Sequence, residues 1–214
     1  MPDFTCADCG TSFTLPDRVV DRYPGWTPRQ CLDCRSGSTE TAAGSKPRKR
    51  SATSRQNLTL ADVLDRYHDG PTSGVFTDGS SVPNPGPGGW GAVYVVDGEI
   101  VEEAHGHDPD TTNNRMELTA LIEATRLVPP GTPATIYTDS NLAVQTINQW
   151  AAGWERNGWK RKTGPIKNLE LVKRLWGIMQ SRPELTVTWI RAHDGSRWNE
   201  YADSLSTAWS RQEI

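Results

Sequence analysis

The architecture of the chain follows from residues 75–105, which read VFTDGSSVPNPGPGGWGAVYVVDGEIVEEAH. Residues 75–80 predict one strand, and the apolar runs 90–96 and 99–105 predict two more. Asp97-Gly98 joins the last two runs, and this dipeptide is a strong signal for a two-residue hairpin turn. This stretch therefore predicts three consecutive antiparallel strands.

Beyond this meander the pattern alternates between helices and strands. Asn113 or Asn114 can cap the first helix, and Pro129-Pro130-Gly131 ends it. The expected helices are 113–128, 139–150, 168–181 and 199–211, and the expected strands are 134–138 and 185–191. Antiparallel strands followed by such alternating units predict an α/β fold, in which helices pack on one mixed sheet.

A glycine-rich stretch, Gly86-Pro-Gly-Gly-Trp-Gly91, satisfies the dinucleotide-binding pattern GxGxxG. That pattern binds a pyrophosphate only where it opens a helix after a strand. Here prolines interrupt the stretch and a strand follows it, so we interpret it as a loop without nucleotide-binding function.

All four cysteines lie in the first 34 residues, as the pairs Cys6-x-x-Cys9 and Cys31-x-x-Cys34. Two such pairs suit one tetrahedral Zn²⁺, because each tight turn presents two thiolates. A disulfide framework and a redox motif are the alternatives, although a redox motif needs only one pair. We expect a structural zinc ribbon over residues 1–38, which the metal would help to fold.

The ribbon is followed by two connecting segments. Residues 39–57 are small, polar and basic, which is typical of a flexible linker. Its basic cluster, residues 46–50, would contact phosphates or form part of a solvated tether. Residues 58–74 predict a short connecting helix capped by Thr59, and residues 75–214 the main domain.

Composition and hydropathy argue against a membrane protein and against a secreted one. Hydrophobic residues make up 35% of the 214 residues, the mean hydropathy is −0.62, and the net charge is −3. No apolar run has the roughly 18 residues of a membrane span, and the N-terminus lacks the apolar core of a signal peptide. We expect a cytoplasmic, monomeric protein without a membrane partner.

Four acidic residues stand at the ends of expected elements or inside expected helices: Asp78, Glu117, Asp139 and Asp203. Singly, an Asp after a strand usually forms a turn or caps a helix. Jointly, they would converge if the strands ending at Asp78 and Asp139 were neighbours. Four carboxylates close together need a cation, and hard oxygen ligands suit Mg²⁺ or Mn²⁺.

Residues 75–211 contain a series of short motifs: FTDGS at 76–80, NPG at 84–86, GGWGA at 88–92, TTNNRMEL at 111–118 and YTDS at 137–140. The series continues through Trp150, Trp154, Gly158-Trp-Lys160, and His193 ten residues before Asp203. In order and spacing, these motifs resemble type 1 ribonuclease H, the endonuclease that cuts RNA in RNA/DNA hybrids. The resemblance implies a ribonuclease H-like sheet of five strands with helices on both faces.

The resemblance assigns Asp78, Glu117, Asp139 and Asp203 to two Mg²⁺ ions, for which Mn²⁺ could substitute. Asp139 also stands where the family orients the attacking water, and the implied products have 5′-phosphate and 3′-hydroxyl ends. His193 matches the histidine that assists proton transfer or product release, although a lone loop histidine is usually an ordinary surface residue. The neighbouring Asp194 departs from the family pattern, and we expect its carboxylate to favour the imidazolium form of His193.

Hybrid recognition is implied for a set of amides. Asn84, Asn113, Asn114 and Asn141 match positions that read the minor groove, where the 2′-hydroxyl separates RNA from DNA. Thr112, Asn113 and Asn168 fit a pocket for a DNA-strand phosphate. The alternative for Asn113 or Asn114 is helix capping alone.

The segment 150–174 is basic and contains Trp150, Trp154, Trp159 and Lys160. Basic groups interleaved with aromatic rings fit nucleic-acid contact, and the resemblance identifies the segment as the basic protrusion that grips the DNA strand. An amphipathic helix with core tryptophans is the alternative.

We weighed three other classes of protein: a metal-free binding module, a structural zinc protein with a catalytically dead domain, and a related nuclease that shares the fold or the detached ribonuclease H domain of a reverse transcriptase. The first two conflict with the four retained carboxylates, and the third with the lack of polymerase motifs. The ribbon would add substrate binding or tethering to a partner protein.

Overall fold

The structure is a computed structural model and describes residues 3–14, 17, 27, 29, 31, 34 and 58–211. The chain divides into two units, Met1–Ser54 and Arg55–Ile214, which we treat separately. The expected linker 39–57, with its basic cluster 46–50, lies outside the described residues. Among the helices that are described, none is both long and apolar enough to cross a membrane.

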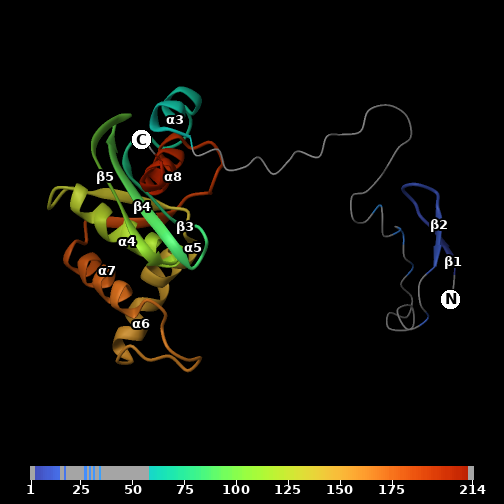
Figure 1. The fold of residues 1–214 in the computed structure, drawn as a ribbon. Coiled ribbons are helices and arrows are strands. Elements are labelled where there is room, and N and C mark those ends of the chain that lie inside the picture. The colour runs from blue at the N-terminus through green and yellow to red at the C-terminus, as the bar shows by residue number, and fades with distance from the viewer. Residues whose placement is uncertain are drawn as a thin grey trace. The chain divides into compact units, whose positions relative to one another are not determined.

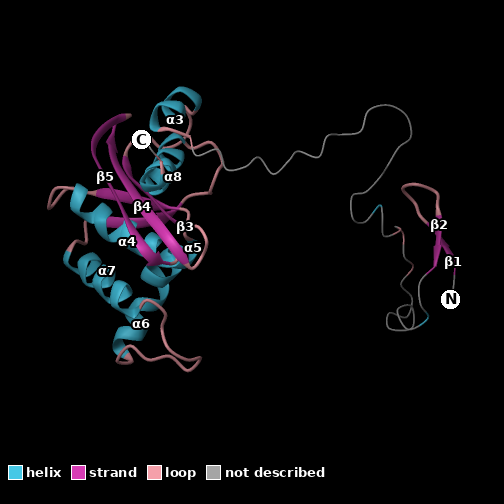
Figure 2. Ribbon diagram, in the orientation of Figure 1, coloured by secondary structure: helices cyan, strands magenta, loops and turns pink. Residues whose placement is uncertain are grey.

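The larger unit is built on one mixed sheet, whose strands are magenta in Figure 2. The strand order is β5-β4-β3-β6-β7. β3, β4 and β5 pair antiparallel, whereas β3, β6 and β7 run parallel. The strands are β3 (Gly74–Ser81), β4 (Gly86–Val96), β5 (Glu99–Thr111), β6 (Ala134–Thr138) and β7 (Leu185–Trp189). The predicted five-stranded α/β sheet is confirmed, including the pairing of β3 with β6 that convergence of Asp78 and Asp139 requires.

Helices cover both faces of this sheet, as predicted (Figure 1). They are α3 (Leu60–Arg66), α4 (Asn113–Leu127), α5 (Asn141–Gln145), α6 (Ala151–Arg156), α7 (Leu169–Ser181) and α8 (Arg197–Thr207). A π-helical turn η1 (Thr146–Trp150) joins α5 to α6, and a 3₁₀ turn η2 (Ala208–Ser210) follows α8.

Alternation along the strands produces two apolar cores. Val75 of β3 belongs to the core under α4 and α7, whereas its neighbour Phe76 belongs to the core under α8 and α3. Successive residues of a strand point to opposite faces, so each central strand contributes to both cores. Both side chains are fully buried, which fixes the register of β3 and therefore the face that Asp78 occupies.

Several expected boundaries were wrong. The glycine-rich stretch expected as a loop begins β4 at Gly86, and Gly88, Gly89 and Gly91 pair with β3. β5 continues to Thr111, well past the expected end at 105. The helix after Asp139 continues through η1 into α6 and ends at Arg156 rather than near Trp150.

The cap of α4 also differs from the expectation. The N-cap is Thr112, whose side chain accepts a hydrogen bond from the backbone N–H of Arg115, so neither Asn113 nor Asn114 is the capping residue. Asn113 is instead the first helical residue, and its side chain is available for contacts outside the helix.

In the smaller unit, the described residues form a short antiparallel ladder. β1 (Asp3–Thr5) pairs with β2 (Ser12–Thr14), with Phe4 opposite Phe13. The turn between them is closed by a hydrogen bond from the backbone N–H of Gly10 to the carbonyl of Cys6, 3.0 Å long.

Candidate active site and cysteine cluster

Three carboxylates from three elements converge beside the centre of the sheet. Asp78 lies in β3, Asp139 directly follows β6, and Glu117 lies in the second turn of α4. One oxygen of each of these side chains lies within 4.8 Å of the others. Because β3 and β6 are parallel neighbours, Asp78 and Asp139 are presented near one end of the strand pair.

Glycine lets the flanking helices approach this point. A Cβ on Gly79 would lie 2.2 Å from the backbone nitrogen of Glu117, so only glycine allows α4 to pass so close to β3. On β4, a Cβ on Gly91 would lie 2.6 Å from the carbonyl oxygen of Ala202 in α8. These two contacts set how closely α4 and α8 approach the sheet beside the carboxylate of Asp78.

Asp78 is buried, with 7% of its surface exposed. Its Oδ2 accepts a 2.5 Å hydrogen bond from the hydroxyl of Ser206, which also lies 3.2 Å from the hydroxyl of Ser80. Burial, and next the negative charge of Asp203, raise the pKa of Asp78 to about 6, although the bond from Ser206 acts in the opposite direction. Ser206 orients the carboxylate and was not foreseen from the sequence.

Glu117 is affected even more strongly by its surroundings. Burial raises its pKa well above the ordinary value, and the charges of Asp78 and Asp139 add to the rise. Thr138 partly offsets this, because its hydroxyl donates to Oε2 of Glu117 over 3.5 Å. The cluster therefore holds several carboxylates close together in a buried site, where their negative charges are poorly solvated and repel one another. A divalent cation would relieve this repulsion.

Asp203, the fourth predicted carboxylate, lies on α8 in a second group with His193 and Glu200. The three ligand atoms of this group lie within 4.8 Å of one another. The charge of Asp203 nevertheless raises the pKa of both Asp78 and Glu117, so the two groups interact electrostatically.

The carboxylate that faces His193 is not the expected one. Nδ1 of His193 lies 3.5 Å from Oε2 of Glu200, whose side chain is only 9% exposed. The Asp194 carboxylate instead accepts a hydrogen bond from the backbone N–H of Ser196. Glu200 occupies the first turn of α8, one turn before Asp203, and helical spacing could have indicated it.

Asp139 is supported from the neighbouring strand. The indole Nε1 of Trp189, at the end of β7, donates to the carbonyl oxygen of Asp139 over 3.1 Å. This bond ties the turn after β6 to β7, and nothing in the sequence pattern predicts it.

The predicted substrate amides separate into two sets. Asn113 binds the end of β3, because its Oδ1 accepts from the backbone N–H of Ser81 over 2.6 Å. Asn84 accepts from the backbone N–H of Asn113 over 3.3 Å, so these two residues join the loop after β3 to the start of α4. Thr112 serves as the cap of α4.

The second set, Asn114 and Asn168, lines a pocket. It lies between the start of α4, the α5–α6 helical run and the loop before α7, and is lined by Asn114, Trp150, Trp154 and Asn168 among other residues. The rings of Trp150 and Trp154 are 5.8 Å apart and tilted by 40°. Arg161 and Lys167 add positive charge to the lining.

Apart from Asn84, Thr112 and Asn113, three more predicted contacts are not among the residues lining this pocket. Trp159 packs against the α4–α7 core, and the ammonium of Lys173 lies 5.4 Å from its ring centre. Lys160 is exposed, and Asn141 is the exposed first residue of α5. For Trp159, the alternative that the tryptophans of segment 150–174 pack into the core is therefore correct in part.

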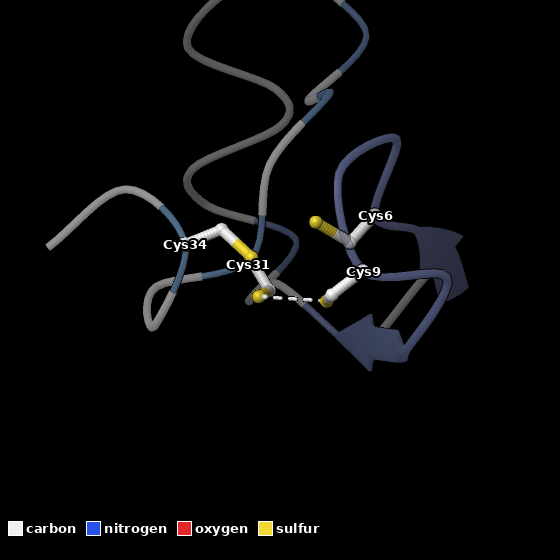
Figure 3. Close-up of side chains that lie close together, drawn as sticks. All are labelled: Cys6, Cys9, Cys31 and Cys34. Carbon is white, nitrogen blue, oxygen red and sulfur yellow. Dashed lines mark hydrogen bonds between the residues drawn. The ribbon is translucent and has the colours of Figure 1, made fainter. Parts of the chain in front are cut away.

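In the smaller unit the four cysteines gather around one point, as Figure 3 shows. The sulfur atoms all lie within 4.8 Å of one another, and those of Cys9 and Cys31 are 3.7 Å apart. All four are free thiols. Tetrahedral Zn²⁺ with Zn–S bonds of about 2.3 Å needs sulfur atoms about 3.8 Å apart, so the donor set fits zinc.

Residues 71–211 match the family model described as RNase H. A ribonuclease H of Methylorubrum extorquens (strain PA1) is 41% identical over 140 residues, which cover 65% of this chain and 60% of that protein. A ribonuclease H of Jannaschia sp. (strain CCS1) is 45% identical over 139 residues, covering 63% of this chain and 88% of that protein.

Among solved structures, the chain is similar to LC9-RNase H1, a type 1 RNase H with the type 2 active-site motif. The TM-score is 0.52 at 33% sequence identity, and the match covers 66% of this chain and 74% of that chain.

Proposed function

The chain belongs to the ribonuclease H family, and we propose that it is an endoribonuclease that hydrolyses the RNA strand of RNA/DNA hybrids. The observation that carries the proposal is the convergence of Asp78, Glu117 and Asp139 on one point, with Asp203 close enough to raise the pKa of two of them. The matched domain extends over this whole group of residues.

We assign the four carboxylates to two divalent cations, Mg²⁺ or Mn²⁺. When bound, such ions lower the pKa of a water molecule and neutralise the charge of the leaving oxygen. Asp139 would orient the attacking water, and Ser206 would keep the Asp78 carboxylate turned towards the cluster. The products would carry 5′-phosphate and 3′-hydroxyl ends.

His193 would hold or deliver a proton beside the leaving 3′-oxygen. The argument is its place, since it shares a 4.8 Å group with Asp203 and Glu200. Glu200 would orient the imidazole through Nδ1, which leaves Nε2 to face the substrate.

Hybrid binding would use amides from both sets together with Asn141. The side chains of Asn84, Asn113, Asn114 and Asn141 would read the minor groove. A DNA-strand phosphate would be held by Thr112, Asn113 and Asn168. Asn114, Trp150 and Trp154 would line the path of the DNA strand, because they share one pocket with basic residues. Trp159 and Lys160 would contribute from the adjoining protrusion.

For the cysteine cluster we propose one structural Zn²⁺ held by Cys6, Cys9, Cys31 and Cys34. The ion would neutralise four thiolates whose sulfur atoms lie within 4.8 Å of one another, and it would supply folding free energy to a unit with little apolar core. The unit would then aid substrate binding or tether the enzyme to a partner protein.

The test of the proposed function is cleavage of labelled RNA/DNA, RNA/RNA and DNA/DNA duplexes of one sequence, with Mg²⁺, Mn²⁺ or EDTA. We expect cleavage of the RNA strand of the hybrid alone, and only with a divalent ion. Asp139→Asn is the matched loss-of-function control, because the amide preserves size and removes charge. Cleavage in EDTA, or equal cleavage of all three duplexes, would contradict the proposal.

A further inference from the structure

Residues 58–70 precede the family match, which begins at residue 71, yet they are part of the folded unit. The carbonyl of Leu58 accepts hydrogen bonds from Arg211 and from the hydroxyl of Ser204, the latter 2.7 Å long. α3 then places Val63, which is 1% exposed, in the core beneath α8. Figure 1 shows α3 beside α8.

The end of this segment reaches the loop that bears the histidine, residues 193–196, which we call the histidine loop. Asp69 forms an isolated parallel bridge with Ser196, and its carbonyl accepts from the backbone N–H of Arg197 over 2.8 Å. The ring of Tyr67 lies next to Gly195, 3.9 Å from where a Cβ on that residue would stand.

Gly70 of this segment lies very close to the histidine loop. A Cβ at this position would lie 2.5 Å from Oγ of Ser196, and the residue has φ +104°, which side chains rarely allow. The segment backbone therefore packs directly on the last residue of the histidine loop.

The histidine loop needs such support. His193 has φ +50° and Gly195 φ +89°, and a non-glycine residue holds a left-handed conformation only where its surroundings fix it. Inside the loop, the hydrogen bond from the backbone N–H of Ser196 to Asp194 supplies a local restraint. The bridge to Asp69 adds a restraint from outside the loop.

We propose that residues 58–70 are a positioning element that fixes the histidine loop and so places the imidazole of His193 beside Asp203. This rests on the proposed function, because the role of His193 belongs to it. The alternative is that the segment merely covers an apolar face. That task is performed by α3, whereas the contacts of Asp69 and Gly70 lie beyond the helix and meet the loop.

The test compares Gly70→Ala with Leu64→Ala in the full-length chain. The first forces the segment away from Ser196, whereas the second removes packing between α3 and the apolar core under α8. Each change is also made in a His193→Ala background, and Tyr67→Ala serves as a second loop-facing variant if Gly70→Ala does not fold. The readouts are kcat at saturating hybrid and the imidazole NMR signals of His193.

We expect Gly70→Ala to lower kcat about tenfold and to shift the His193 signals, since misplacement of a reacting group is costly. In the His193→Ala background the same change should lower kcat by less than about twofold, because the group through which it acts is gone. Leu64→Ala should leave the signals in place.

Equal losses of kcat in both backgrounds, or unmoved His193 signals in Gly70→Ala and Tyr67→Ala, would overturn the proposal. A fully active His193→Ala would instead contradict the proposed role of the histidine. In that event, the NMR signals alone would decide whether the segment positions the loop.

Discussion

Replacing Asp78 by Asn should remove activity and at the same time stabilise the metal-free protein. The carboxylate is buried among other carboxylates, and its pKa rises from the ordinary 3.8 to about 6. The neutral amide avoids this repulsion, and its oxygen can still accept the hydrogen bond from Ser206. A residue retained for catalysis would thus destabilise the fold that carries it.

The magnitude and its pH dependence follow from linkage. With a raised pKa, the folded state binds the proton more tightly than the unfolded state, so stability falls as pH rises through this range. A shift from 3.8 to about 6 is equivalent to about 3 kcal/mol, lost progressively between these two pH values. Asp78→Asn should therefore be more stable than the parent by about 3 kcal/mol at pH 7.5 and by almost nothing at pH 3.5.

Urea unfolding followed by circular dichroism in EDTA, repeated from pH 3.5 to 8, measures this difference. Asp65→Asn, at an exposed aspartate on α3, is the matched control and should change the unfolding free energy by less than about 0.5 kcal/mol. Added Mg²⁺ should stabilise the parent more than Asp78→Asn, because it binds the intact cluster better. A variant less stable than the parent at pH 7.5, or a difference that does not depend on pH, would refute the reasoning.

Four further outcomes are expected. His193→Ala should lower kcat by about 10²-fold, whereas Asp194→Ala should lower it by less than about twofold, since Glu200 rather than Asp194 faces the imidazole. Equal losses in the two variants would contradict this. Arg182→Ala should lower the unfolding free energy by about 2 kcal/mol in urea titrations, because its guanidinium donates to three carbonyls at the end of α4, and Arg182→Lys should recover only part of it. A chelator that removes Zn²⁺ but spares Mg²⁺ should release one zinc per chain, measured by mass spectrometry, with kcat unchanged; loss of hybrid cleavage would count against a purely structural ion. Deleting Met1–Ser54 should weaken hybrid binding and flatten its salt dependence, and equal Kd values with parallel slopes would point to protein tethering instead.

The sheet could be predicted because its signals are local. Apolar runs and the Asp97-Gly98 turn define the meander, and both turn residues have the positive φ that such a turn requires. The strand ends were less predictable, since pairing between β4 and β5 extends both strands into glycine-rich and polar sequence. There the register of a partner strand, rather than the apolar pattern, determines where a strand begins and ends.

In the candidate site, too, some residues could be predicted from local sequence signals and others could not. The four carboxylates could be singled out because they stand at the ends of expected strands or in expected helices, and the resemblance to ribonuclease H implied that they act together. Ser206 and Trp189, which support them, could not be predicted, since both act through contacts between elements far apart in the chain. Glu200 lies close to His193 in the chain, and helical spacing could have indicated it. Sequence adjacency suggested Asp194 as the carboxylate beside His193, whereas in the structure Nδ1 of His193 lies 3.5 Å from Oε2 of Glu200.

Glycine residues are tertiary features that the sequence does indicate, because a glycine inside a strand often marks a place where another backbone approaches closely. Gly79 follows Asp78 directly, and its missing Cβ is what lets α4 bring Glu117 against β3. Gly91 does the same for α8, and Gly70 for the histidine loop. A glycine inside a strand weakens that strand, so its presence in an otherwise regular element indicates that another backbone approaches closely. At Gly79 and Gly91, therefore, the places where catalytic helices meet the sheet could be read from residues that carry no chemistry themselves.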